Sequence, residues 1–229
     1  MTTTLANTAL DLAAMERRAV NRTLQEAGRG DFTVLNPSGM HALACGLMHP
    51  IGVTIRGHAG YYCAGMNQEA TVTVEGNAGT GVAENMMSGT VRVTGDASQS
   101  AGATGHGGLL VIEGNTSARC GISMKGIDIV VGGNIGHMSA FMAQAGRLVV
   151  LGDAGADLGD SIYEARLYVR GQVASLGADC IEKEMQGEHR EELAELLAKA
   201  QMDASPEQFR RYGSARKLYH FNIEHLDQY

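Results

Sequence analysis

The residues able to perform acid–base or metal chemistry are scattered along this 229-residue chain. None of the eight histidines lies in an HExxH or similar metal-binding spacing, and we expect each at the surface or in a turn. The four cysteines include no CxxC pair, which gives a zinc site or an iron–sulfur cluster no support. We interpret Cys45, Cys63, Cys120 and Cys180 as small buried apolar residues with reduced thiols.

Two further groups of residues have compositions that can be compared with known catalytic and nucleotide-binding sites. Asp153, Asp157 and Asp160 are close in sequence, and glycosidases need two carboxylates roughly 5–10 Å apart in a groove. We favour a solvated corner for these three. The glycine-rich stretch 102–108 lacks the lysine and the following helix of a phosphate loop, so it does not predict nucleotide binding. The sequence therefore predicts no catalytic, cofactor-binding or metal-binding residue in this chain.

Composition narrows the class of protein. The chain has 31 glycines but only 3 prolines, and 44% of its residues are hydrophobic, which excludes collagen and glycine-rich disorder. The net charge of −7 makes nucleic acid an unexpected partner. No apolar run approaches the ~18 residues that span a membrane, and the N-terminus lacks the features of a signal peptide. We therefore expect a cytoplasmic protein without membrane association.

The glycines follow a period of 19 residues without insertion or deletion. The repeat glycines are Gly57, Gly76, Gly95, Gly114, Gly133, Gly152 and Gly171. Aliphatic residues occupy every position four and two residues before them. These are Val53, Val72, Val91, Leu110, Ile129, Leu148 and Leu167, and Ile55, Val74, Val93, Ile112, Val131, Val150 and Val169. Such alternation places both columns on one face of a β-strand in each repeat.

Two other columns support this register. The residue after each glycine suits a turn: His58, Asn77, Asp96, Asn115, Asn134, Asp153 and Gln172. Seven residues after each glycine, only Ala or Gly occurs: Ala64, Ala83, Gly102, Gly121, Ala140, Gly159 and Ala178. We interpret this small-residue column as a tight inward corner.

A 19-residue unit is too short to bury its own apolar face, so stacked units must bury one another. The pattern predicts an all-β fold, a single-stranded right-handed β-helix of about seven or eight coils. An imperfect earlier coil is expected at 32–35, with Val34 one period before Val53. The methionine pairs Met86/Met124 and Met66/Met142 are both expected to fill the core.

Helical segments are expected to flank the rod and to cap its open ends. Apolar periodicity predicts helices over 9–27 and 189–201, and Ser205-Pro206 predicts the start of a short helix. The expected organisation is an N-terminal cap (1–30), the β-helix (31–180) and a C-terminal tail (181–229).

The tail is rich in aromatic and basic residues, a composition typical of protein–protein interfaces. Two interpretations stay open: contact with another chain, or packing of the tail on its own rod. Together with the N-terminal helix, it supplies the interface candidates Arg18, Asn21, Arg22, Phe209, Arg210, Arg211, Tyr212, Arg216, Tyr219 and Phe221.

The repeat also resembles a known family. Gly76-Asn-Ala-Gly79 and Gly152-Asp-Ala-Gly155 resemble the GXGXG β-helix domain that ends the large subunit of glutamate synthase. Arg18-Ala-Val-Asn21 is similar to the Arg-Ala-Val-Gly sequence at the entry to that domain, with Asn21 in place of glycine. The stretch from Asn36 to Leu47 matches an Asn-x-x-Gly…Gly-Leu pattern of free-standing relatives. The resemblance covers about residues 16–180.

The stand-alone length and the tail most resemble the β-helix subunit of N-methylglutamate synthase, the Glx-type proteins. The resemblance implies a scaffold subunit without an active site of its own. Its implied partners are a class II amidotransferase-like subunit and a synthase-like subunit that holds FMN and an iron–sulfur cluster. The implied complex converts glutamate and methylamine into N-methylglutamate and ammonia.

Two alternatives remain. A related β-helix subunit occurs in formylmethanofuran dehydrogenase and formyltransferase/hydrolase complexes, which the Arg18-Ala-Val20 sequence disfavours. A solenoid enzyme is the other, but the 19-residue unit has no hexapeptide subdivision of the kind acyltransferases show. If the chain were such a solenoid enzyme, the purified single chain would show turnover.

Overall fold

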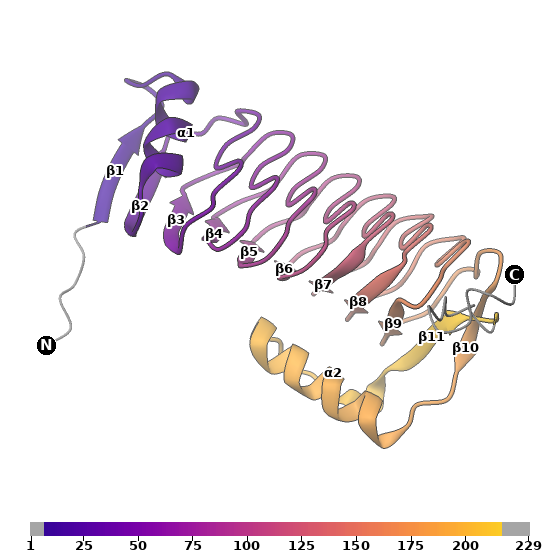
Figure 1. The fold of residues 1–229 in the computed structure, drawn as a ribbon. Coiled ribbons are helices and arrows are strands. Elements are labelled where there is room, and N and C mark those ends of the chain that lie inside the picture. Colours follow the sequence, from indigo (N-terminus) through magenta and orange to yellow (C-terminus); the bar gives the residue numbers. More distant parts are fainter. Residues whose placement is uncertain (1–6, 217–229) are drawn as a thin grey trace, which may run out of the picture.

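The computed structural model describes residues 7–216, which form a β-solenoid with two α-helices (Figure 1). Eleven strands make one sheet in the order β1-β2-β3-β4-β5-β6-β7-β8-β9-β11-β10. The strands are β1 (Asn7–Asp11), β2 (Gly30–Leu35), β3 (Ile51–Ile55), β4 (Thr71–Val74), β5 (Thr90–Val93), β6 (Leu109–Ile112), β7 (Lys125–Val131), β8 (Ala145–Val150), β9 (Arg166–Val169), β10 (Cys180–Lys183) and β11 (Arg210–Ser214). The helices are α1 (Arg17–Glu26), α2 (Gly187–Ala200) and a 3-10 turn, η1 (Pro206–Gln208).

From β3 to β9 the strands are parallel, and facing residues are 19 positions apart in sequence, as in the pair Val72 and Val91, except that Lys125 faces Ala145 at the start of β7. The two predicted aliphatic columns are confirmed as core, because all fourteen of their side chains are at most 2% exposed. Each coil thus buries its apolar pair against the coils before and after it.

The period changes at both ends of the rod. Val34 pairs with Ile55, 21 positions on, so the expected pairing of Val34 with Val53 is wrong. A slip of two residues leaves every side chain on the same face, and alternation alone therefore does not reveal it. At the other end Leu158 faces Leu176, 18 positions on. The last coil is one residue shorter, which displaces Ala178 from the small-residue column.

Opposed to the strand in each coil is a stretch of unusual backbone, which we call the left-handed wall. Positions five, seven and nine after the repeat glycine have positive φ, as Gly81 (74°), Ala83 (57°) and Asn85 (54°) do. The small-residue column is the middle one and is buried, as predicted, up to Gly159. Its residues are small because a left-handed backbone and a packed interior coincide there: a Cβ on Gly102 would lie 2.6 Å from Ile129 Cδ1.

Side chains alternate along this wall between interior and solvent. Met86 and Met124 are fully buried, as expected, whereas Met66 and Met142 are 54% and 40% exposed. The prediction that the second pair fills the core was wrong. Both residues occupy the third left-handed position, which directs the side chain outward.

The N-terminal helix is shorter than predicted. Residues Asn7–Asp11 form β1, which pairs in parallel with β2, and α1 begins only at Arg17. Val20 and Leu24 of α1 are buried, so the helix covers the open end of the core. The sheet also extends beyond residues 31–180 at both ends.

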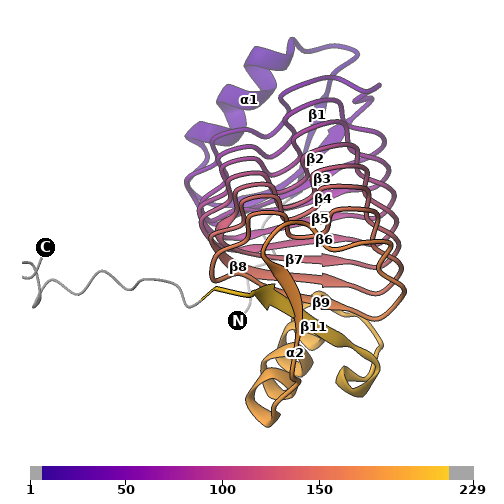
Figure 2. The same cartoon turned by 90° about the vertical axis from the view of Figure 1, so that its right-hand side faces the viewer.

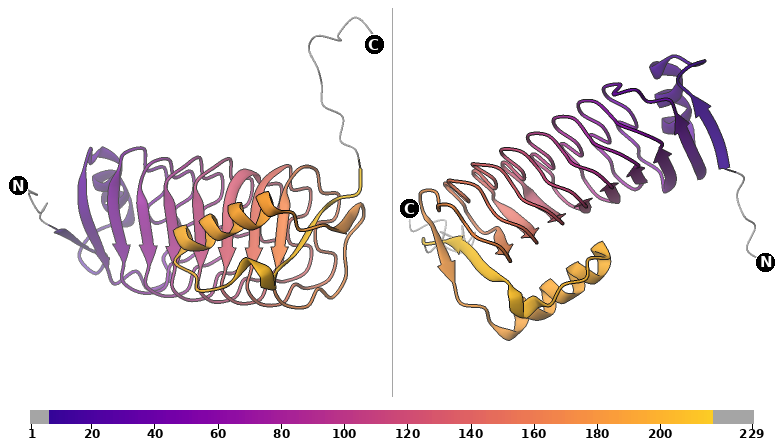
Figure 3. Two further views of the ribbon diagram at one scale, coloured as in Figure 1. Left: turned by 90° about the horizontal axis from the view of Figure 1, so that it is seen from below. Right: turned by 180° about the vertical axis from the view of Figure 1, so that it is seen from behind.

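Helix α2 does not cap the rod end, contrary to expectation. It lies across the outer face of the sheet (Figure 3). The outward column three residues before each repeat glycine changes from polar to apolar where α2 lies: Thr54, Thr73 and Arg92, then Val111, Val130, Val149 and Tyr168. Leu193, Leu196, Leu197 and Ala200 of α2 pack on the apolar part.

At the C-terminal end of the sheet, β11 runs antiparallel between β9 and β10, and β10 is the edge strand. A view along the rod shows β11 beneath the last coil, with α1 and α2 on different sides of the molecule (Figure 2). The short helix predicted at Pro206 is present as η1, with proline in its first turn.

Candidate interaction surfaces

The cysteines and the possible metal ligands can be checked directly in the structure. Within residues 7–216, no group of three or more His, Cys, Asp or Glu side chains is arranged to hold a metal ion. All four cysteines are free thiols, three buried and Cys45 half-buried. Burial raises the pKa of Cys120 to about 12 and that of Cys180 to about 11. These thiols therefore stay protonated and unreactive at neutral pH.

The three aspartates of the predicted corner serve neighbouring coils. Asp153 Oδ1 accepts a hydrogen bond from the backbone N–H of Gln172 at 2.7 Å. Asp157 accepts a hydrogen bond from the Ser175 hydroxyl, and Asp160 accepts one from the Ser161 hydroxyl. Asp160 also accepts a hydrogen bond from the backbone N–H of Ala178 at 3.2 Å. Each carboxylate thus has a structural partner, which agrees with a corner rather than a catalytic pair.

Asp153 belongs to a longer ladder formed by the column after each repeat glycine. From coil to coil, the side chain at this position accepts a hydrogen bond from the backbone N–H of the next residue in the column, over 2.7–3.0 Å. The ladder runs through His58, Asn77, Asp96, Asn115, Asn134, Asp153 and Gln172. It satisfies backbone donors at a turn where the sheet ladder is absent.

Helix α1 performs a similar task at the N-terminal end. Its polar stripe faces the first coil: Arg17 donates to the carbonyl of His41 (3.2 Å), and Gln25 to that of Cys45 (2.8 Å). Between them Asn21 donates to Ala42 O at 2.7 Å and accepts from Ala44 N at 2.9 Å. Asn21, an interface candidate, therefore has both polar atoms bound within this chain.

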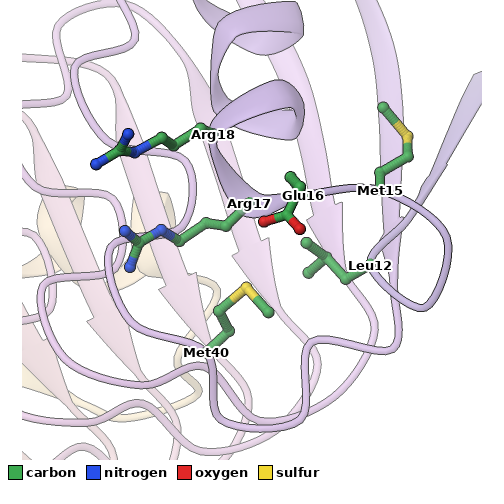
Figure 4. Close-up of a pocket in the computed structure, with 6 residues that line it drawn as sticks. All are labelled: Leu12, Met15, Glu16, Arg17, Arg18 and Met40. Carbon is green, nitrogen blue, oxygen red and sulfur yellow. The ribbon is translucent and has the colours of Figure 1, made fainter.

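Arg18 and Arg22 follow Arg17 and Asn21 by one residue each, so they lie on the adjacent side of α1, and both are exposed. A shallow hollow opens beside them, lined by Leu12, Met15, Glu16, Arg17, Arg18 and Met40. In Figure 4 the Arg17 and Arg18 side chains extend in the same direction, above Met40. These two interface candidates are accessible to a partner.

The C-terminal candidates divide into two groups. Phe209 (5% exposed) packs beneath α2, and Tyr212 (2% exposed) packs in the rod core. For these two residues the structure agrees with packing of the tail on its own rod. Arg210 donates to Gly171 O and Arg211 to Glu184 O, so both guanidinium groups cap carbonyls near the end of the rod. Arg216 forms an exposed ion pair with Asp179. Tyr219 and Phe221 lie outside the described residues.

Sequence reasoning missed one surface. Most of the large apolar side chains that are strongly exposed project from the left-handed wall or the turn that follows it: Tyr61, Tyr62, Met66, Met87, Met142 and Tyr163. The signal was available, because other coils carry small or polar residues at several of these repeat positions. No helix within the described part of the chain is long and apolar enough to span a membrane.

The fold and these surfaces define the class of protein: a β-solenoid whose clustered aspartates bond to its own backbone and whose outer wall exposes apolar and basic side chains. No protein-family model matches the chain. Over 225 residues it is 64% identical to Protein GlxC of Rhizobium meliloti (strain 1021), an alignment that covers 96% of this chain and 99% of that protein. The chain belongs to the GlxC family.

Proposed function

We propose that this chain is the scaffold subunit of a glutamate synthase-like complex, N-methylglutamate synthase in particular. One observation carries the proposal. The three clustered aspartates form hydrogen bonds within the fold and the four thiols are buried or half-buried, while exposed apolar and basic side chains remain for contact with other chains. The resemblance of the glycine repeat to the glutamate synthase β-helix, together with the relation to GlxC, supports the choice of complex.

In this proposal the rod connects two cytoplasmic partners. One is a class II amidotransferase-like subunit, and the other a synthase-like subunit with FMN and an iron–sulfur cluster. Stacked coils repeat every ~4.8 Å and resist bending because each pair shares backbone hydrogen bonds. The rod would hold the two active sites at a fixed separation, so that the amine passes between them without release.

Purification of the tagged chain from its native cells tests this proposal. We expect two further chains to elute with it, with flavin absorbance and N-methylglutamate formation from glutamate and methylamine. Recovery of the chain alone would contradict the proposal, and so would turnover by the purified single chain. A complex that contains a formyltransferase instead would favour the alternative assembly.

A further inference from the structure

We infer that the N-terminal corner of the left-handed wall is the docking surface for one protein subunit of the proposed complex, a subunit with an acidic contact face. We define this N-terminal corner surface by Arg18, Arg22, His41, Tyr61, Tyr62 and Met66. The inference rests on the proposed function and names the face that meets a partner.

The surface contains an aromatic platform. The His41 and Tyr61 rings stack with centroids 4.4 Å apart, and Tyr62 meets Tyr61 edge-on at 6.4 Å. Both tyrosines are half exposed. Gly79 and Gly81 of the next coil make room for them: a Cβ on either glycine would lie within 2.8 Å of a tyrosine ring carbon. The rings therefore lie along the rod and present a broad contact area at low entropic cost.

Met66 extends the platform on the same coil. Its side chain is 54% exposed, although a methionine is normally buried where the fold allows it. Tyrosine, methionine and arginine are the residue types that protein interfaces favour over the rest of a protein surface. Their occurrence together on one coil and on the helix bonded to the coil before it fits a protein partner.

Charge identifies the kind of partner. Arg18 and Arg22 are one helical turn apart on the exposed side of α1, and neither has an ion-pair partner within residues 7–216. Arg17 connects this helix to the platform through its bond to His41 O. The chain as a whole carries −7, so the two arginines are a local site of positive charge, with Glu16 as an acidic neighbour of Arg18 in the hollow. Carboxylates on a partner would complement it.

Two other occupants fit less well. A symmetric contact between two copies would bring the like charges of Arg18 and Arg22 from both copies into one interface. Nucleic acid would bring a dense row of phosphates to a chain whose net charge is −7, whereas a protein face can pair single carboxylates with the two arginines.

The test uses the complex purified from cells, with the chain changed at the corner. Arg18→Glu/Arg22→Glu and Tyr62→Ser should each lower the yield of one co-eluting subunit by about tenfold or more and retain the other. Arg119→Glu and Tyr163→Ser are matched controls, since both residues are exposed on the same side of the rod in distant coils. These controls should retain both subunits.

Circular dichroism checks that each variant is folded. Full retention of both subunits by the corner variants would overturn the inference and leave the proposed function intact. An equal loss of subunit from the control variants would also overturn it. So would a dimer of the purified wild-type chain that the corner variants dissociate, or nucleic acid bound to the chain that ribonuclease removes. If partner subunits elute without flavin, the proposed function fails, but the corner variants still show whether this surface binds a partner. A wild-type chain that elutes with no partner overturns both.

Discussion

Individual side chains finish the hydrogen bonding that the coils leave open. The left-handed wall pairs with its neighbours through backbone bonds, but the first and last coils each lack a neighbour. Asn21 supplies one donor and one acceptor to the first coil, and Arg210 caps a carbonyl of the last. Leaving such groups unpaired is costly, so these side chains stabilise the ends more than their surface position suggests.

Asn21→Ala removes both bonds to the first coil. We expect the free energy of unfolding to fall by about 1–3 kcal/mol, because Ala42 O and Ala44 N lose their partner. Urea denaturation measures the change. Arg22→Ala, one residue along on the exposed side of α1, is the control and should change stability by less than about 0.5 kcal/mol. Equal effects would mean that the cap contributes nothing.

His189 makes stability depend on pH. The expectation that every histidine lies at the surface or in a turn is wrong for this residue, because it is in α2 and only 5% exposed. Its Nδ1 accepts the Gln186 backbone N–H at the start of the helix. Burial, with Arg211 nearby, lowers its pKa below the ordinary 6.5. The unfolded chain therefore takes up a proton at higher pH than the folded one, and stability falls as pH drops through 6.5.

His189→Gln should remove this part of the pH dependence, since glutamine at this helical position still accepts the hydrogen bond. Denaturation at pH 7.5 and at pH 5.5 measures the difference between variant and wild type. A wild-type slope that persists unchanged in the variant would assign the dependence to other groups.

Each coil combines one strand with one left-handed wall. The strand needs aliphatic residues pointing inward, and the wall needs positions that tolerate positive φ. In the small-residue column a positive φ coincides with a buried site, and the chain uses only alanine or glycine there up to Gly159. A small residue in this column is therefore required by packing as well as by backbone conformation.

Gly121→Leu should destabilise the rod by several kcal/mol, since overpacking alone costs about 1–3 kcal/mol and backbone strain adds to it. Even a Cβ here would lie 3.2 Å from Met124 Sδ and 3.3 Å from Ile129 Cδ1. Gly121→Ala is the control with a smaller expected cost, because Ala83 and Ala140 occupy the same column. Thermal unfolding compares them, and a leucine variant of wild-type stability would contradict this packing.

Helix α2 is attached through an apolar contact and a network of charges. Leu196 is buried against the sheet, Arg92 donates to the Ala200 carbonyl at 2.8 Å, and Glu192 pairs with Arg166. Leu196→Ala should cost about 2–5 kcal/mol at this contact. Hydrogen exchange should then show faster exchange in residues 187–200 and unchanged protection in β3 and β4, with Glu195→Ala as the neutral control. Uniform loss of protection would mean that helix and rod unfold together.

At the scale of the whole molecule, the protein is a stack whose length is set by the number of coils. Nearest-neighbour contacts carry the stability, so a coil can be removed if the register is kept. The covered part of the outer face spans β6 to β9, whereas the wall and the N-terminal corner surface remain open. This asymmetry gives the rod distinguishable sides.

Deletion of residues 77–95 removes one complete period and should leave a folded rod shorter by ~4.8 Å. Deletion of residues 77–94 shifts the register by one, which turns the apolar columns outward, and should abolish folding. Circular dichroism and hydrogen exchange separate the two. If the scaffold proposal holds, the shorter rod should still bind both subunits and make less N-methylglutamate. If both deletion variants were unfolded, the idea that a single coil can be removed without loss of the fold would be wrong.

The sequence by itself determined the repeating part of this protein. A period without slips places the same residue in the same environment in each coil, so the columns of Val53 and Ile55 could be assigned without coordinates. Only the tertiary structure decided what breaks the period. The two-residue slip at Val34 preserves the alternation, and the outward direction of Met66 follows from its left-handed backbone. Helix α2 lies on the sheet because one outward residue from each of four strands, from Val111 in β6 to Tyr168 in β9, forms an apolar strip there. These features arise from contacts between segments distant in sequence, which a local pattern does not contain.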